Sequence, residues 1–175
     1  MLNLFKRKEP PVKIIDKVWM SELSKLNALV STLDENNETV IIFWFEESLQ
    51  KLEAKINRSA TILLAKETNS IRVSGKKVIV AEHFPLFQTE IDFFNKINLP
   101  VVQVWSALDE PLFSRFGGEK IIQLMKQLGM KEDEMVEHNM ISKAIRNAQD
   151  KISKKVIIPQ SARSQQNWLE KNMPI

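Results

Sequence analysis

Short continuous apolar runs alternate with amphipathic stretches along the chain as far as Trp105. Residues 39–45, TVIIFWF, form one such run, and a run of this length predicts a strand that is buried on both faces. The next stretch, 46–56, has apolar side chains at helical spacing and acidic residues in its first turn, which favours a helix. The same patterns predict strands at 39–45, 60–65, 71–73, 78–81 and 101–105, and helices at 17–33, 46–56 and 86–97.

These elements alternate, which predicts the α/β fold class with a mostly parallel sheet that is flanked by helices. Only a dozen residues separate Ala65 from Val78, too few for a helical crossover. The strands on either side of this gap are therefore either paired as a hairpin or placed apart in the sheet. In the first helix, Leu23, Leu26, Val30 and Leu33 form the stripe that we expect to face the core.

After Trp105 the pattern becomes helical. We predict helices at about 110–116, 119–128 and 139–154, and a last short helix after Pro159 with Ser161 as its cap. The predicted organisation is a flexible basic tail (1–13), an α/β domain (14–130) and a C-terminal helical extension (131–175).

Charge is distributed unevenly along the sequence. The net charge of the chain is +3, but residues 143–175 alone carry seven basic and two acidic side chains, and residues 14–142 sum to −5. A nucleic-acid-binding protein usually places its basic surface on the folded body, so nucleic acid is not the expected partner.

The chain has no cysteine, which excludes disulfides and thiol catalysis and suits the cytoplasm, our expected location. No apolar run reaches membrane-spanning length. The start, MLNLFKRK, places apolar residues before three cations, and such a segment makes at most a transient membrane contact.

Four motifs at consistent spacing lie between residues 108 and 152. They correspond to S-L-E-D-x-L-M-R-x-F-G, L-M-x-x-L-G-L, E-x-E-x-I-E-H and A-I-E-N-A-Q-K-K, and together they resemble SecA, the motor ATPase of bacterial protein export, just past its second nucleotide-binding domain. The matching residues are Leu108, Asp109, Leu112, Phe116, Gly117, Leu124, Met125, Leu128, Gly129, Glu132, Glu134, Glu137, His138, Ala144, Ile145, Asn147, Ala148, Gln149 and Lys151.

The resemblance implies a degenerate RecA- or helicase-like fold, related to P-loop NTPases. However, no G-x-x-x-x-G-K-[ST] loop occurs, and no arginine lies between Arg72 and Arg115, where the SecA family has an arginine- and glycine-rich stretch. We therefore expect a non-catalytic domain with no catalytic residue, cofactor or metal. Phe45 to Ser48 resembles the point at which a strand leads into a Ser- and Glu-containing helix in that family.

Three residues are candidates for an interaction site. Glu82 and His83 follow a predicted strand, where α/β proteins often place functional groups. Trp168 lies in a polar helix and is the tryptophan expected to be exposed, whereas Trp44 and Trp105 are expected in the core. His138 is expected to cap a helix or to anchor a loop, because a metal site would need further ligands.

These observations lead to a non-catalytic SecA-like protein-interaction module, with a partner from the export machinery or its clients and with homo-oligomerisation left open. Two alternatives remain. One is a divergent nucleotide hydrolase completed by a partner, and the other is a helicase-derived nucleic-acid-binding module.

Overall fold

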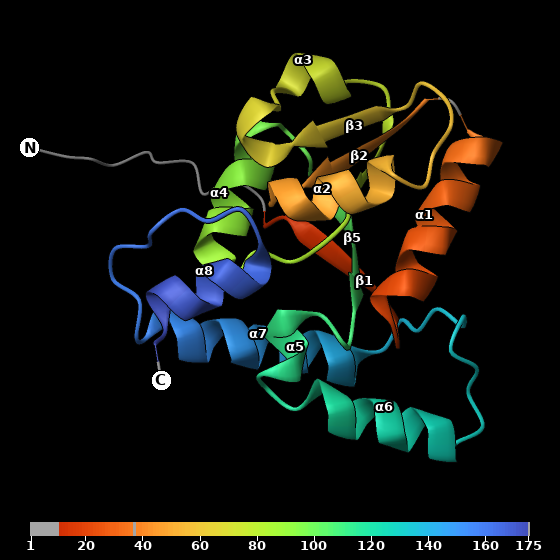
Figure 1. Ribbon diagram of the computed structural model, residues 1–175. Coiled ribbons are helices and arrows are strands. Elements are labelled where there is room, and N and C mark those ends of the chain that lie inside the picture. Colours follow the sequence, from red (N-terminus) through yellow and green to blue (C-terminus); the bar gives the residue numbers. More distant parts are fainter. Residues whose placement is uncertain (1–10, 37, 175) are drawn as a thin grey trace, which may run out of the picture.

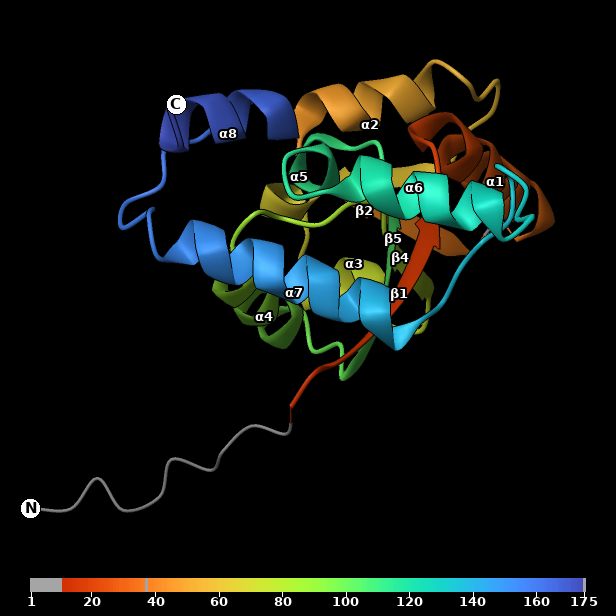
Figure 2. The same ribbon diagram turned by 90° about the horizontal axis from the view of Figure 1, so that it is seen from below.

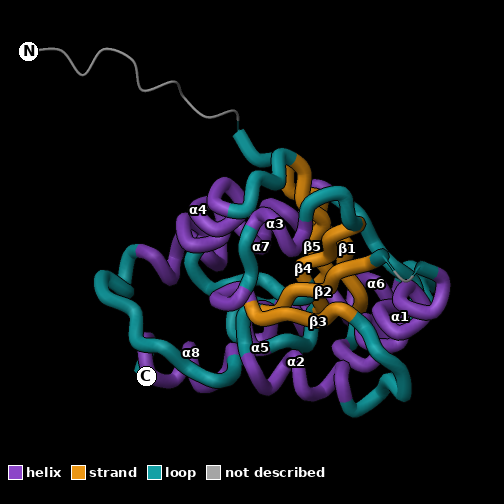
Figure 3. The backbone as a smooth tube through the Cα atoms, turned by 90° about the horizontal axis from the view of Figure 1, so that it is seen from above, coloured by secondary structure: helices purple, strands orange, loops and turns teal. Residues whose placement is uncertain are grey.

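Five parallel strands form one sheet in the order β1-β5-β4-β2-β3, and helices cover both of its faces (Figures 1 and 3). The computed structural model describes residues 11–36 and 38–174. The predicted α/β class is confirmed. The strands are β1 (Lys13–Trp19), β2 (Thr39–Phe43), β3 (Thr61–Leu64), β4 (Lys77–Val80) and β5 (Val101–Ala107). The helices are α1 (Glu22–Glu35), α2 (Glu46–Glu53), α3 (Ser70–Val73), α4 (Phe87–Lys96), α5 (Pro111–Ser114), α6 (Gly118–Gln127), α7 (Asn139–Ser153) and α8 (Gln165–Asn172), with a 3₁₀ turn, η1 (Ala65–Glu67).

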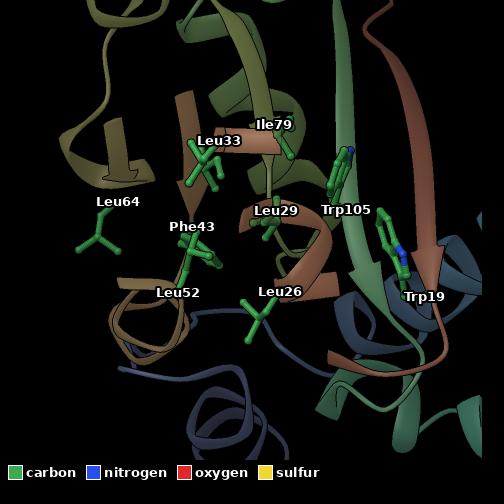
Figure 4. Close-up of a cluster of buried hydrophobic side chains, with 11 residues drawn as sticks. Trp19, Leu26, Leu29, Leu33, Phe43, Leu52, Leu64, Ile79 and Trp105 are labelled. Carbon is green, nitrogen blue, oxygen red and sulfur yellow. The ribbon is translucent and has the colours of Figure 1, made fainter. Parts of the chain in front are cut away.

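The core lies in two layers, one on each face of the sheet. Every residue of β2 is buried, as its continuous apolar run predicts. Side chains of α1 and α2 pack on one face, around Phe43 and Trp105 (Figure 4). Those of α4 pack on the other face, around Phe94. The prediction that Trp105 lies in the core is confirmed, while Trp44 is only partly buried.

The predicted start of the first helix is wrong, because residues 13–19 form the edge strand β1. This strand runs parallel to β5, with Lys13 opposite Val101 and Trp19 opposite Ala107. Of the predicted tail, residues 1–10 lie outside the described part, and Lys13 already belongs to β1. The helix itself begins after Ser21, whose side chain caps it.

The buried face of α1 also differs from the predicted stripe. Leu23 is 58% exposed, whereas Lys25 and Leu29 are buried beside Leu26 and Leu33. A buried lysine is not expected from an apolar pattern, and its reason lies in the partners described below.

Between β3 and β4 the chain passes through η1 and α3, and β2 lies between these two strands in the sheet. The placed-apart alternative is therefore right, and the hairpin is wrong. The strand predicted at 71–73 is wrong as well, because this segment forms the single-turn helix α3. Asn69 caps it by accepting hydrogen bonds from the backbone N–H groups of Ile71 and Arg72.

Helices α5 to α8 gather below the sheet in Figure 1, where they close the ends of the strands. Ala148, Ile152 and Trp168 of α7 and α8 pack with Phe45 and Leu112 in one cluster, and α6 and α7 pack against β1 in another. The cap of α8 is Ser164 and not Ser161. None of the helices in residues 11–36 and 38–174 has the length and apolarity that crossing a membrane requires.

Candidate functional site

Glu82 lies just past the carboxyl end of β4 and holds the junction between β2 and α2. One carboxylate oxygen accepts hydrogen bonds from the backbone N–H groups of Trp44 and Phe45, both at 2.9 Å. The other oxygen accepts a hydrogen bond from the Ser48 hydroxyl at 2.7 Å. In parallel α/β sheets, the crevice at the carboxyl ends of the strands and the start of a following helix usually bind an anionic ligand. Here a carboxylate of the protein itself occupies this position.

A buried ion pair lies next to Glu82. Lys25 of α1 is 1% exposed, pairs with Glu110 and donates a hydrogen bond to the carbonyl oxygen of Ala81 at 2.6 Å. Burial disfavours the charged ammonium, but Glu110 and Glu82 outweigh this effect and raise the pKa of Lys25. Burial raises the pKa of Glu82 to about 7, although Lys25 and the Ser48 hydroxyl favour its ionised form.

His83 lies between two carboxylates and is completely buried. Its Nδ1 is 2.9 Å from Glu90 of α4, and its Nε2 is 3.1 Å from Asp16 of β1. Burial disfavours the imidazolium, but these carboxylates raise the pKa of His83 to about 10. His83 lowers the pKa of Asp16 against the opposing effect of burial. The ring is therefore protonated at neutral pH and donates from both nitrogens.

Two glutamines connect this strand end to the C-terminal helices. Gln149 of α7 donates to the Phe84 carbonyl oxygen at 2.7 Å and to Glu90 at 2.9 Å. Gln165 of α8 donates to the His83 carbonyl oxygen at 2.9 Å and accepts the Leu112 N–H at 2.7 Å. The segment after β4 is thus held from both sides.

Glu82 and His83 are both buried, so a substrate cannot reach either side chain, and their hydrogen bonds hold neighbouring elements together. Glu82 is 3% exposed and His83 is 0% exposed. Trp168 is 1% exposed and packs edge-on against Phe84, so the expectation that it is exposed is wrong. Its helix is polar on average, but the side chain points into the cluster that α7 and α8 share.

His138 caps α7 as predicted, accepting the Met140 N–H at 3.1 Å. Within the described ranges, no group of three or more His, Cys, Asp or Glu side chains is placed to hold a metal ion. Sequence reasoning missed Lys25, Asp16 and Glu90, whose proximity to Glu82 and His83 depends on the strand order. The one signal that could have pointed to Lys25 is its position next to the apolar stripe of α1.

A second feature is a set of exposed apolar side chains that α6, the following loop and the start of α7 contribute. Its side chains are Leu124, Leu128, Met135 and Met140, which are 50%, 72%, 42% and 68% exposed. We call these four residues the 124–140 surface. The loop is fixed to the edge of the sheet by Val136, which exchanges two backbone hydrogen bonds with Val18 of β1.

The fold and this site define an α/β domain with a parallel sheet, in which the side chain of Glu82 occupies the junction between β2 and α2. Part of the chain is similar to protein translocase subunit SecA. The match to SecA of Psychrobacter cryohalolentis is 44% identical over 46 residues, and that to SecA of Acinetobacter baumannii (strain ATCC 17978) is 38% identical over 52 residues. They cover 26% and 30% of this chain but only 5% and 6% of the two SecA proteins. No protein-family model matches the chain. The SecA resemblance is therefore confirmed for a segment.

Proposed function

We propose that this chain is a non-catalytic SecA-like domain that works by binding another protein, a component or a client of the export machinery. The observation that carries the proposal is that side chains of the protein itself occupy the carboxyl ends of β2 and β4. Glu82 accepts hydrogen bonds from the backbone N–H groups of Trp44 and Phe45, and Lys25 forms a buried ion pair with Glu110. A triphosphate would need free backbone donors and cations at such an edge.

The 124–140 surface supplies a contact surface for the partner. Leu128 and Met140 are more than two-thirds exposed, although burying such side chains is favourable by about 1.5–3 kcal/mol each. Methionine side chains adapt their shape to a partner, which suits a protein contact. This surface also lies within residues 108–152, the part in which the sequence resembles SecA, and the partial matches to SecA support a connection to export.

The test is affinity capture from the cell that produces the protein, with three versions of the chain. We expect the wild type to retain one or more translocation components or exported clients. The double variant Leu128→Asp/Met140→Asp should lose them. The control is Ile71→Asp, because Ile71 is 85% exposed and belongs to α3. Figure 1 shows α3 and α6 at opposite ends of the molecule.

Two results would contradict the proposal. One is equal capture by the double variant and the control, which would place the contact elsewhere. The other is magnesium-dependent binding of ATP by the isolated chain in isothermal titration, which would favour the nucleotide hydrolase. A gel shift at physiological salt tests the nucleic-acid alternative in the same way.

A further inference from the structure

A pocket of about 520 Å³ lies between the ends of β2 and β3 and the chain that leads from Pro159 into α8. The start of α2 approaches the start of α8 here, and Glu47 N–H donates to the Arg163 carbonyl oxygen at 3.0 Å. Figure 2 shows the two helices nearly in line. A volume of this size is typical of small-molecule sites. The pocket is separate from the 124–140 surface and shares no residue with it.

The wall of the pocket is aromatic. Phe84 is its centre, with ring centroids 5.1 Å from Trp44, 5.8 Å from Phe45 and 5.6 Å from Trp168. Trp44 and Phe84 are partly exposed, whereas Phe45 and Trp168 are buried behind them. Adjacent rings that are held in fixed orientations offer a planar ligand stacked or edge-on contacts without further ordering of the protein.

The rim of the pocket is cationic. Lys66 follows β3 and Lys171 lies on α8, and both are exposed. Arg163 also lines the pocket, but its guanidinium is 3.1 Å from Glu46, so this pair contributes no net charge. Lys171 makes one long hydrogen bond to the Ser161 carbonyl oxygen, at 3.3 Å, which leaves its charge uncompensated. The rim therefore carries two positive charges above an apolar wall.

We propose that this pocket binds a small aromatic anion, with a planar ring against Trp44 and Phe84 and an acidic group next to Lys66 and Lys171. The apolar wall would bind the ring through burial of its surface, and the two ammonium groups would select for negative charge. A ring without charge would gain only the first contribution, and an aromatic cation would be repelled.

The test uses 2-naphthoate as the probe, with the uncharged 2-naphthalenemethanol as its matched analogue. The chain has four tryptophans and no tyrosine, and two of the tryptophans line the pocket, so intrinsic fluorescence reports binding. We expect saturable binding of naphthoate below about 1 mM, weakening with added salt, and affinity at least about tenfold lower for the alcohol.

Charge-reversal variants distinguish binding in the pocket from binding to other surfaces. Lys66→Glu/Lys171→Glu should weaken naphthoate binding by about tenfold or more without changing the melting temperature. Lys76→Glu/Lys77→Glu, at the opposite end of β4, should bind like the wild type. The proposal is overturned by absence of saturable binding up to about 10 mM, by equal affinity for the alcohol, or by equal affinity in the two double variants.

Discussion

Single residues in this protein are constrained mainly by buried charge, and Lys25 is the clearest case. Its ammonium group is buried with Glu110, and one carboxylate oxygen of Glu110, Oε2, is buried without a hydrogen-bond partner in the described part of the chain. Removing one member of such a pair leaves the other charged group buried and unpaired, which costs more than the pair contributes as a whole.

We therefore expect Lys25→Met to lower the free energy of unfolding by about 3–5 kcal/mol, measured by urea denaturation. Lys25→Met/Glu110→Leu should recover most of this loss, because both charges are then absent. The control is Lys51→Met, which breaks an exposed pair with Glu22 and should cost less than about 1 kcal/mol. Equal losses for Lys25→Met and Lys51→Met would show that the buried pair has no special weight.

The pH dependence of stability follows from His83 and Glu82. The pKa of His83 is raised from 6.5 to about 10, and that of Glu82 from 4.5 to about 7. The folded chain therefore binds both protons more tightly than the unfolded chain. The contribution of His83 is complete below pH 6.5 and is lost as pH rises through 10, and that of Glu82 is lost between pH 4.5 and 7.

We expect the melting temperature to fall as pH rises from about 6 to about 10. In His83→Gln the fall above pH 7 should be smaller, whereas in His138→Gln, which changes the exposed helix cap, it should match the wild type. A His83→Gln variant with the wild-type pH profile would mean that His83 is neutral in the folded protein.

At the scale of elements, local pattern was sufficient where a segment has one character throughout. The apolar run of β2 and the amphipathic spacing of α4 predicted both elements, within two residues of the observed ends. Pattern failed for β1, in which Asp16 and Lys17 interrupt the apolar residues. Asp16 is tolerated there because His83, 67 residues away, neutralises it. No local window contains that information.

In the candidate site too, local pattern predicts some features, and others depend on the strand order. The position of Glu82 and His83 after a strand could be predicted from the sequence. Their partners on α1, β1 and α4 could not, because the strand order decides which of these elements meet. The burial of Trp168 was also beyond local pattern, since the surroundings of its helix come from Phe45, α5, α7 and the segment after β4.

The contacts of α8 predict that this helix is part of the folded core and not an appendage. Trp168 and Leu169 are each 1% exposed, and Gln165 hydrogen-bonds to the main chain of His83 and Leu112. Ending the chain after Lys155 should therefore uncover Phe45 and Phe84 and lower the melting temperature by several degrees or more. Thermal unfolding measures this effect, and Lys171→Ala in the full-length chain is the control. An unchanged melting temperature in the truncated chain would mean that α8 contributes little.

At the scale of the whole molecule, the C-terminal segment and the body carry opposite net charges. Basic side chains are concentrated in residues 143–175, and the structure folds this segment onto a body that is negative overall. Arg163 of this segment forms an ion pair with Glu46 of the body at 3.1 Å. The opposite charges of body and C-terminal segment therefore favour their association, in addition to the apolar contacts.

The position of β1 has a consequence for how the protein is made. In the described sheet, β1 has β5, the last strand, as its only neighbouring strand. Lys13 therefore cannot pair until Val101 has been synthesised. During synthesis at roughly 5–20 residues per second, β1 has no strand to pair with until nearly ninety further residues have left the ribosome. The sheet can be completed only after β5 has been synthesised, and until then β1 is a site for a chaperone or for aggregation.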